Sequence, residues 1–589
     1  MKKRSQIADE YKWNLDSYIK DNDEIEKIFK IIDDLIKIAP KYKDKLQNSD
    51  ILYEAIAGHK QEEMAISRLA HYISHRLNVD SSDIEMIKLE QRFSTAYSRL
   101  LEAESFILPQ IYKLATKFLQ SLLSDSRFKD YDNFINDIIR EKPHRLDEKS
   151  SELLAKMSSF LGGSEQIHSI LVDSEMKYKE AVDSKGKKMP LNNETYPKYL
   201  RSNDPSLRKT AFEHFMDCYS QLNKTFSELY INDIEYDKFY TKLTKYDNLL
   251  ESVLFSEKLP RAVFDNIIKY TEKYIPLLQK YIKTRAKIAY NKKFAYYDLF
   301  EDRNSSKKIS ISDAQNLILS ALSPLGTDYS SNLKRKMSDH SIDYLPNENK
   351  NSGAYCSHCY GAKTMVLTNF INDYNSVSTL AHELGHCINA EYFNSAQPYE
   401  KADISTFAAE IASTVNELLL FQYMMKISKP KDKKYYLKKF LDDVRSTIFR
   451  QIIFTEFEHE IHQKMEQDIP VTYNDLNECY MNINKKFYGR SCILPSCLKY
   501  EWMRVPHFYS PYYVFTYATG MVTAITIVNR ILNEKDFYTK YIDFLKNGVN
   551  KPAVEVLKEI GIDLASAEPY DEAFAFVEKQ LKIYISLYK

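Results

Sequence analysis

The scarcity of glycine limits the folds open to this chain more than any other feature of its sequence. Only 12 of the 589 residues are glycine, which is about 2% where soluble proteins average roughly 7%. Tight β-turns use glycine at their positive-φ positions, so a fold built from many short strands is disfavoured. Apolar residues recur at three- and four-residue spacing in stretches such as 441–465 and 574–587, as they do on amphipathic helices. We therefore predict a mainly α protein.

One apolar, helix-compatible segment carries a pattern that is typical of metal sites. His382 and His386 stand four residues apart, and Glu383 directly follows the first of them. On a helix, both imidazoles lie on one face and can reach a single ion, while the carboxylate beside them can take a proton from a water at that ion. A chance match on an amphipathic helix is the alternative. Two imidazoles and one carboxylate suit zinc and leave a fourth position open, so the pattern predicts one Zn²⁺ per chain.

The third ligand must come from further along the chain. In metzincins it is a histidine ten residues after the first one, but this position holds Tyr392, which excludes that class. Glu391 lies on the same predicted helix, turned by more than a right angle from the ligand face. Glu400 follows a proline in a predicted loop. Neither acid is favoured.

Glu410 is the predicted third ligand because it lies in a second apolar, helical run. Its neighbours Ala409, Ala412 and Ser413 are small, which would allow this helix to approach the first one closely. A carboxylate buried there without a partner would be costly, and coordination of a cation removes that cost. Two further acids, seven residues to either side, could accept the outer N–H of a ligand histidine: Asp403 and Glu417.

These segments and three others resemble oligoendopeptidase F of the thimet-oligopeptidase family. Residues 377–386, and the E-I-A-S-T-x-N-E pattern at 410–417, carry the resemblance around the metal motif. Residues 13–16 match an opening W-[DN]-L, residues 449–458 match F-R-Q…E-F-E, and residues 506–520 match P-H-F-Y…Y-V-Y-x-Y-A-T-G. Many peptidases share the metal motif alone, whereas this ordered combination is specific and spans nearly the whole chain.

The resemblance implies an architecture. We expect a mainly α, two-lobed helical body that encloses a deep substrate channel, with one small β-sheet near the zinc-binding helix. The expected regions are an N-terminal helical region (1–110), a helical connecting region (111–190) and a zinc metallopeptidase catalytic domain (191–589).

Three local stretches refine this expectation. The polar residues 184–193 are the candidate junction before the catalytic domain. Residues 329–361 are rich in turn formers and favour a loop. The apolar, β-branched run 363–370 favours a strand, which the resemblance implies would pair with an extended substrate backbone.

An aromatic block near the C-terminus is expected to supply donors to the transition state. Tyr509, Tyr513 and Tyr517 recur every four residues, hence on one face if the block is helical. The family comparison implies that Tyr517 is closest to the transition-state tyrosine and that His507 is close to the substrate-binding histidine. Tyr513 is a further candidate. The alternative is an aromatic helix packed in the core, which is natural in a chain with 45 tyrosines.

Two other groups of potential ligands are weaker. Cys356, His358 and Cys359 could form half of a second zinc site, but the matching half has no obvious counterpart. His459 and His462 follow the E-F-E pattern at three-residue spacing, where packing or salt bridging is favoured over coordination.

Charge and cysteine usage indicate where the protein acts. The 82 basic residues balance the 82 acidic ones, so no whole-chain field favours nucleic acid or a membrane surface. The N-terminus lacks the apolar core of a signal peptide, and 7 irregularly spaced cysteines disfavour a disulfide framework. We expect a cytoplasmic protein whose partners are oligopeptide substrates, and neither nucleic acid nor membrane. The sequence does not indicate an oligomeric state.

The metal motif and the family resemblance together predict a zinc-dependent endopeptidase with Glu383 as the general base. The channel that the resemblance implies would limit it to internal bonds of short, unfolded oligopeptides. Two alternatives stay open. A zinc carboxypeptidase would trim peptide C-termini and would need a cation for the terminal carboxylate, such as Arg450 or Arg504. A non-catalytic peptide-binding protein would have kept the fold without the chemistry.

Overall fold

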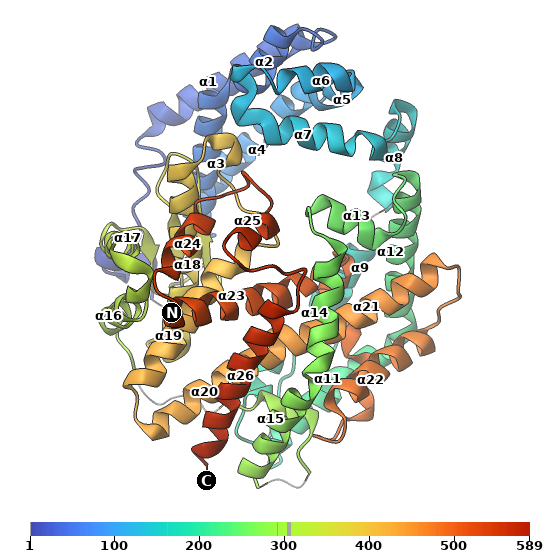
Figure 1. Cartoon of the computed structure of the whole chain (residues 1–589), viewed down its shortest axis with the longest axis vertical. Helices are drawn as coiled ribbons and strands as arrows, with labels where there is room; N and C mark the ends of the chain where they lie inside the picture. Colours follow the sequence, from blue (N-terminus) through green and yellow to red (C-terminus); the bar gives the residue numbers. More distant parts are fainter. Residues whose placement is uncertain (1, 162, 291–292, 303–307, 589) are drawn as a thin grey trace. The chain divides into compact units, whose positions relative to one another are not determined.

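The computed structural model describes residues 2–161, 163–290, 293–302 and 308–588. The chain is mainly helical and its strands are short (Figure 1), which confirms the predicted fold class. By its internal contacts, the chain forms two compact units of three segments each. Unit 1 comprises Met1–Pro143, Lys307–Leu420 and Glu534–Val556; unit 2 comprises His144–Ser306, Phe421–Asn533 and Leu557–Lys589. The three regions expected from the sequence, 1–110, 111–190 and 191–589, describe consecutive segments of the chain and stay a prediction.

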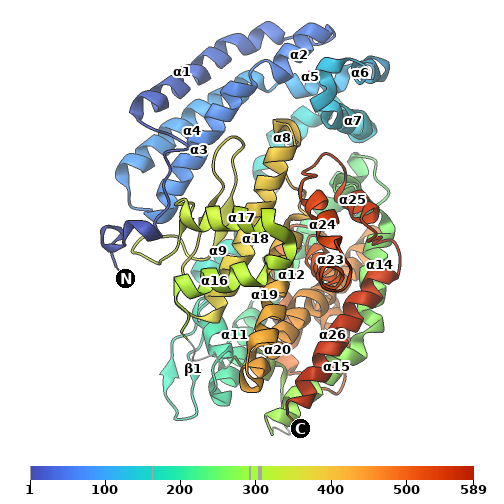
Figure 2. The same cartoon turned by 60° about the vertical axis from the view of Figure 1, so that its left-hand side comes forward.

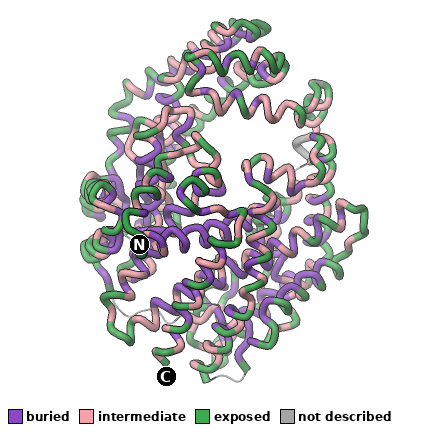
Figure 3. Tube along the Cα trace, viewed as in Figure 1, coloured by how far each residue is buried: buried purple, intermediate pink, exposed green. Residues whose placement is uncertain are grey.

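Unit 1 begins with a group of long amphipathic helices. In α1 (Asn22–Ile38) the Asp21 side chain caps the first turn by accepting from the Glu24 N–H. Buried and exposed residues then alternate along the helix (Figure 3), because its apolar residues recur on one face. That face packs against α3 (Lys60–Val79) and α4 (Ile84–Glu104), as Figure 2 shows. The other helices that lie wholly in unit 1 are α2 (Ser49–Ala57), α5 (Ile107–Lys113), α6 (Thr116–Leu122), α7 (Asp132–Glu141), α16 (Ile311–Ala321), α17 (Gly326–Ser338), α18 (Tyr374–Ala396) and α24 (Phe537–Leu545).

Unit 1 also holds a three-stranded sheet of order β3-β5-β4. The central strand β5 (Met365–Leu367) lies inside the predicted stretch 363–370 but is shorter. It pairs in parallel with β3 (Ile342–Asp343) and antiparallel with β4 (Tyr355–Ser357). Because both edges of β5 are occupied, the expectation that this strand pairs with substrate is wrong. Among the described strands, β3 and β4 are the two edge strands of this sheet, and each has β5 as its one neighbour.

The predicted loop 329–361 is wrong in its first part. Residues up to Ser338 belong to α17, which buries Tyr329, Leu333 and Lys336 at helical spacing. The turn-forming residues on which the prediction depended, from Pro346 to Gly353, all follow this helix.

Unit 2 contains most of the remaining helices. Residues 441–465, predicted as helical, run through the end of α20 (Pro430–Val444), a π-helical turn η10 (Arg445–Phe449) and most of α21 (Arg450–Glu466). The other helices of this unit are α8 (Glu148–Leu161), α9 (Gly163–Ile170), α10 (Thr195–Leu200), α11 (Pro205–Gln221), α12 (Asn223–Leu243), α13 (Leu249–Ser256), α14 (Arg261–Lys273), α15 (Ile275–Ile288), α22 (Tyr473–Tyr488), α23 (Phe515–Asn533) and α26 (Glu568–Ser586). The boundary between segments falls inside α19 (Ala409–Ile427) and α25 (Ala553–Glu559).

The candidate junction 184–193 forms part of a second small sheet in unit 2, in addition to the single sheet predicted. Strands β1 (Ala181–Val182) and β2 (Lys188–Met189) are antiparallel. Gly186, with φ +79°, lies in the turn between them, in a conformation that glycine adopts without strain. As for the membrane, no helix in the described part of the chain is both long and apolar enough to cross a bilayer.

Candidate metal centre

The site is built where α18 and α19 approach each other closely in unit 1. A Cβ at Gly385 would lie 2.6 Å from Ser413 Cα and 2.7 Å from the Ala412 carbonyl oxygen, so only glycine fits at this contact. The close approach confirms what the small residues of the second helix predicted. Asn416 then ties the two helices together, because its amide nitrogen donates to the Ala381 carbonyl at 3.0 Å while its oxygen accepts from Tyr329.

Three predicted ligands meet at this contact. The Nε2 atoms of His382 and His386 are 3.2 Å apart, and Glu410 Oε2 lies 3.3 Å from the first and 3.6 Å from the second. Tetrahedral zinc with bonds of about 2.0–2.2 Å places its ligand atoms about 3.3–3.6 Å from one another. The donor set and its spacing therefore fit a zinc ion. Among the described residues, His382, His386 and Glu410 form the one group of three or more potential ligands whose atoms lie close enough together to hold a metal ion.

Glu417 orients the first histidine, as the sequence suggested for one of two flanking acids. Its Oε1 lies 2.7 Å from His382 Nδ1, and its Oε2 accepts from the Ser378 hydroxyl at 2.8 Å. A carboxylate only accepts, so Nδ1 carries the proton and Nε2 presents its lone pair to the ligand position. Asp403, the other candidate, lies 3.8 Å from His358 Nε2 with its side chain mostly exposed.

The electrostatics of this cluster favour positive charge. Burial lowers the pKa of His382, but hydrogen bonds to Glu410 and Glu417 outweigh it and raise the value to about 10. In Glu410, burial raises the pKa, while hydrogen bonds from the two histidines outweigh that effect and lower it. When both imidazoles are neutral, the carboxylates in and beside the cluster give it a negative charge, which suits a divalent cation. These carboxylates are Glu383, Glu410 and Glu417.

Glu383 lies on α18 between the two histidines and is 6% exposed. Burial raises its pKa, and the neighbouring histidines act in the opposite direction. Glu383 lies beside the two predicted ligands of this helix, because spacing along a single helix decides its position.

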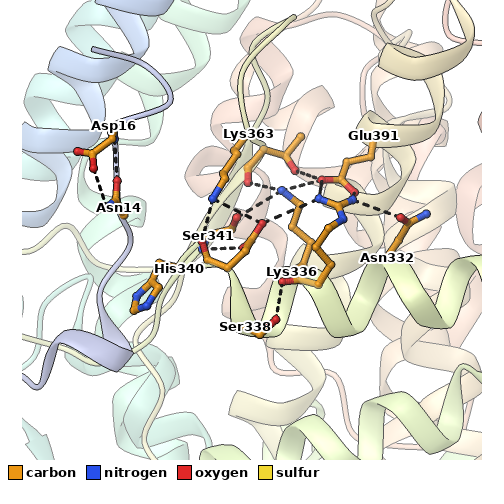
Figure 4. A network of polar contacts seen from close by, with 12 residues as sticks. Asn14, Asp16, Asn332, Lys336, Ser338, His340, Ser341, Lys363 and Glu391 are labelled. Carbon is orange, nitrogen blue, oxygen red and sulfur yellow. Dashed lines mark hydrogen bonds and ion pairs between the residues drawn. The ribbon is translucent and has the colours of Figure 1, made fainter. Parts of the chain in front are cut away.

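The other downstream acids are engaged elsewhere in unit 1. Glu391 forms ion pairs with the buried Lys336 at 2.6 Å and with Arg335 at 2.5 Å, and Figure 4 shows it in this polar network. Lys336 also donates to the Thr364 carbonyl just before β5. Glu400 accepts from Tyr131 and pairs with Lys60.

The aromatic block lies in unit 2 and is not one helix. His507 and Tyr509 belong to the 3-10 turn η12 (Pro506–Tyr509), and α23 begins only at Phe515. Tyr509 therefore does not share a face with Tyr513 and Tyr517, and its ring packs against His168 at 5.0 Å.

The three site candidates of the block do come together. The imidazole of His507 stacks on Tyr513 with ring centroids 5.9 Å apart, and Tyr517 meets both rings edge-on. The Tyr517 hydroxyl lies 3.5 Å from that of Tyr513. Burial, followed by the charge of Arg450, lowers the pKa of His507, so this imidazole is neutral at neutral pH.

The arginines that a carboxypeptidase would need are also in unit 2. Arg450 donates to the buried Glu501 at 2.9 Å, and Arg504 lies 3.9 Å from the same carboxylate. Glu501 accepts from two phenols as well, Tyr480 and Tyr296. The charge of Arg450 is therefore compensated inside the protein.

Comparison with known proteins gives one consistent result. Residues 198–576 match the family model of Peptidase family M3, and residues 110–178 match that of Oligopeptidase F. Oligopeptidase PepF of Bacillus subtilis is 33% identical over 98% of this chain and 87% of its own. An oligoendopeptidase F homolog of Borreliella burgdorferi is 31% identical over 95% of both chains. The crystal structure of oligoendopeptidase-F from Enterococcus faecium aligns with a TM-score of 0.73 at 26% identity, over 96% of this chain and 99% of that one.

Proposed function

This chain belongs to peptidase family M3 and is a metallo-oligopeptidase, and from that premise we propose that it is a zinc-dependent endopeptidase of short, unfolded oligopeptides. The observation that carries the proposal is the group His382, His386 and Glu410, whose ligand atoms have the spacing of a tetrahedral zinc site. Glu383 beside them supplies the base that peptide hydrolysis needs.

In this proposal each residue has one task. His382 and His386 hold zinc through Nε2 and Glu410 through Oε2, and zinc, when bound, lowers the pKa of a water and polarises the scissile carbonyl. Glu383 accepts the proton of the attacking water on its carboxylate and returns it to the nitrogen of the leaving amine. Glu417 keeps His382 in the tautomer that presents Nε2.

The neutral donors of unit 2 complete the proposed chemistry. The Tyr517 hydroxyl donates to the oxyanion that forms in the transition state, and His507 binds the substrate carbonyl in the ground state. Tyr513 supports both rings by its stacking and edge contacts. A group that donates more strongly to the transition state than to the substrate raises kcat.

The substrate class follows from the family and from the sheet. We propose that the substrate lies extended in a deep channel and pairs with the outer edge of β4, because β5 has neighbours on both sides and β4, one of the two edge strands, packs against α18. Oligopeptides are then the partners, one Zn²⁺ per chain is the cofactor, and the cytoplasm stays the expected location.

The runner-up is a carboxypeptidase. The pairing of Arg450 with Glu501 disfavours Arg450 as the cation for a terminal carboxylate, because a compensated charge holds such a group weakly. The non-catalytic alternative gives no reason for the burial of Glu383, because peptide binding alone does not need a base beside the metal ligands.

The test compares one peptide with its C-terminally amidated twin, by mass spectrometry of the digests. We expect the same internal cuts in both, because an endopeptidase does not need the terminal carboxylate. Zinc-loaded Glu383→Gln protein, purified in parallel, is the control: it should retain the metal and cut neither peptide, which shows that the cuts come from this site. Loss of cleavage on the amide would establish the carboxypeptidase instead.

A further inference from the structure

We propose that Glu458 and His459 are positioning residues that hold Tyr512 and thereby set the geometry of His507, Tyr513 and Tyr517. The inference deepens the proposed function and rests on it, since it assumes that this aromatic group donates to substrate. It also gives a task to the E-F-E pattern of the sequence, which the metal centre does not use.

Tyr512 has an unusual backbone conformation at a critical place. Its φ is +55°, in the left-handed region where a bulky residue is strained, and its side chain is 1% exposed. It lies between η12, which carries His507, and the start of α23, which carries Tyr517. Strained residues persist only where the surrounding structure holds them, and such residues cluster at active sites. The conformation of Tyr512 decides where Tyr513, the next residue, points.

Glu458 holds the backbone of this residue. Its Oε1 accepts the Tyr512 N–H at 2.7 Å, and its carboxyl is buried on α21. Its second oxygen, Oε2, is buried without a hydrogen-bond partner in the described part of the chain. Burying a carboxyl oxygen without a hydrogen bond costs free energy. Among the described residues, the hydrogen bond that offsets this cost is the one to the Tyr512 amide.

His459, the next residue of α21, holds the side chain. Its Nδ1 lies 3.1 Å from the Tyr512 hydroxyl. Phe264 of α14 packs edge-on against both rings, at 5.1 Å from His459 and 5.7 Å from Tyr512. Glu458 and His459, two consecutive residues of α21, therefore bind the backbone amide and the phenol of Tyr512. We call this pair of residues the clamp, because two contacts to one residue fix the direction in which the chain continues.

The first test is a set of variants at Glu458. Glu458→Ala removes the acceptor, so the segment that carries Tyr513 shifts, and a misplacement of about 1 Å costs about 10²-fold in kcat. KM should rise as well, because the same segment carries His507, the proposed substrate-binding group. Burial raises the pKa of Glu458 to about 8, against the opposing Tyr512 N–H, so glutamine resembles the protonated carboxyl. Glu458→Gln keeps an acceptor oxygen and should restore kcat.

The matched control is Glu460→Ala on the same helix. Glu460 is half-exposed and pairs with Lys464, so its loss should leave kcat and KM unchanged. Amide hydrogen exchange of the peptide covering residues 510–515 reads the clamp without reference to catalysis. Exchange should be faster in Glu458→Ala and in Tyr512→Phe, which loses the His459 contact, and unchanged in Glu460→Ala.

A double-mutant cycle with Tyr517→Phe separates positioning from a general loss of stability. If Glu458 acts through the aromatic group, Glu458→Ala should add little to the loss that Tyr517→Phe already causes. Independent losses that multiply would overturn the inference, as would unchanged exchange at 510–515 in both clamp variants. If Glu458→Ala does not fold, Tyr512→Phe carries the exchange test alone. Full activity of Tyr517→Phe would refute the proposed role of that phenol, and the exchange result would still decide whether the clamp exists.

Discussion

Neighbouring side chains orient two of the three predicted ligands: Glu417 holds His382, and a hydroxyl holds Glu410. Its Oε2, the predicted ligand atom, accepts from the Ser413 hydroxyl at 3.0 Å one turn further along α19. The same oxygen lies between the two imidazoles. Carboxylate oxygens with this degree of orientation need little rearrangement to bind an ion, which favours tight binding.

We expect Glu410→Ala to lose most of the bound zinc and, with it, peptidase activity. Two histidines alone leave the ion with too few protein ligands for a stable site. Metal content of the purified protein, measured by atomic emission, gives the answer directly. Asp403→Ala is the matched control, because that acid lies against His358 instead and its variant should keep the metal. Stoichiometric zinc in Glu410→Ala would transfer the third-ligand role to Glu417 or Glu400.

At the scale of secondary structure, the decisive feature is the contact between α18 and α19. The proposed metal ligands come from both helices, so the separation of the helix axes sets the distance between the imidazoles and Glu410. Gly385 permits this separation, because a Cβ there would meet the backbone of Ala412 and Ser413 and neither can move as a flexible side chain does.

Gly385→Ala should therefore destabilise the protein and weaken zinc binding together. Overpacking at such a contact costs about 1–3 kcal/mol, and moving the helices apart also separates Glu410 from the histidines. Thermal unfolding and zinc titration measure the two effects. Gly163→Ala in α9 is the control, since a Cβ there meets no described atom within 4 Å, and alanine should be tolerated. A Gly385→Ala protein with normal stability and normal zinc affinity would show that the contact is not as tight as described.

At the scale of the whole molecule, the proposed channel makes a prediction about substrate size. Peptides of roughly a dozen residues, about 40 Å long when extended, should be cut while folded proteins resist. Reduced casein, although unfolded, should also be a poor substrate, because the limit is chain length. A short peptide copied from casein is the matched control and should be cut efficiently. Rapid digestion of intact casein by the active protein, and not by Glu383→Gln, would mean an open cleft.

Much of the metal centre and the fold class could be read from local sequence. The H-E-x-x-H spacing works because three of the groups lie on one helix, where geometry follows from residue number alone. The sequence predicts Glu410 as the third ligand because its small neighbours indicate a close contact between two helices, and this contact is present. The start of the segment 329–361 resembles a loop because polar residues outnumber apolar ones in α17, although Tyr329 and Leu333 have helical spacing.

The sequence by itself determined that the protein is mainly helical and that His382, Glu383 and His386 share one helix, because composition and spacing within a single helix decide both. Tertiary structure alone decided which strand lies at the centre of the sheet and which two lie at its edges, because strand order depends on segments far apart in the chain. It also decided that Tyr509 leaves the aromatic group, since the left-handed turn at Tyr512 breaks the four-residue repeat. That turn in turn depends on Glu458, 54 residues earlier, and a contact across such a separation leaves no periodic trace in the sequence.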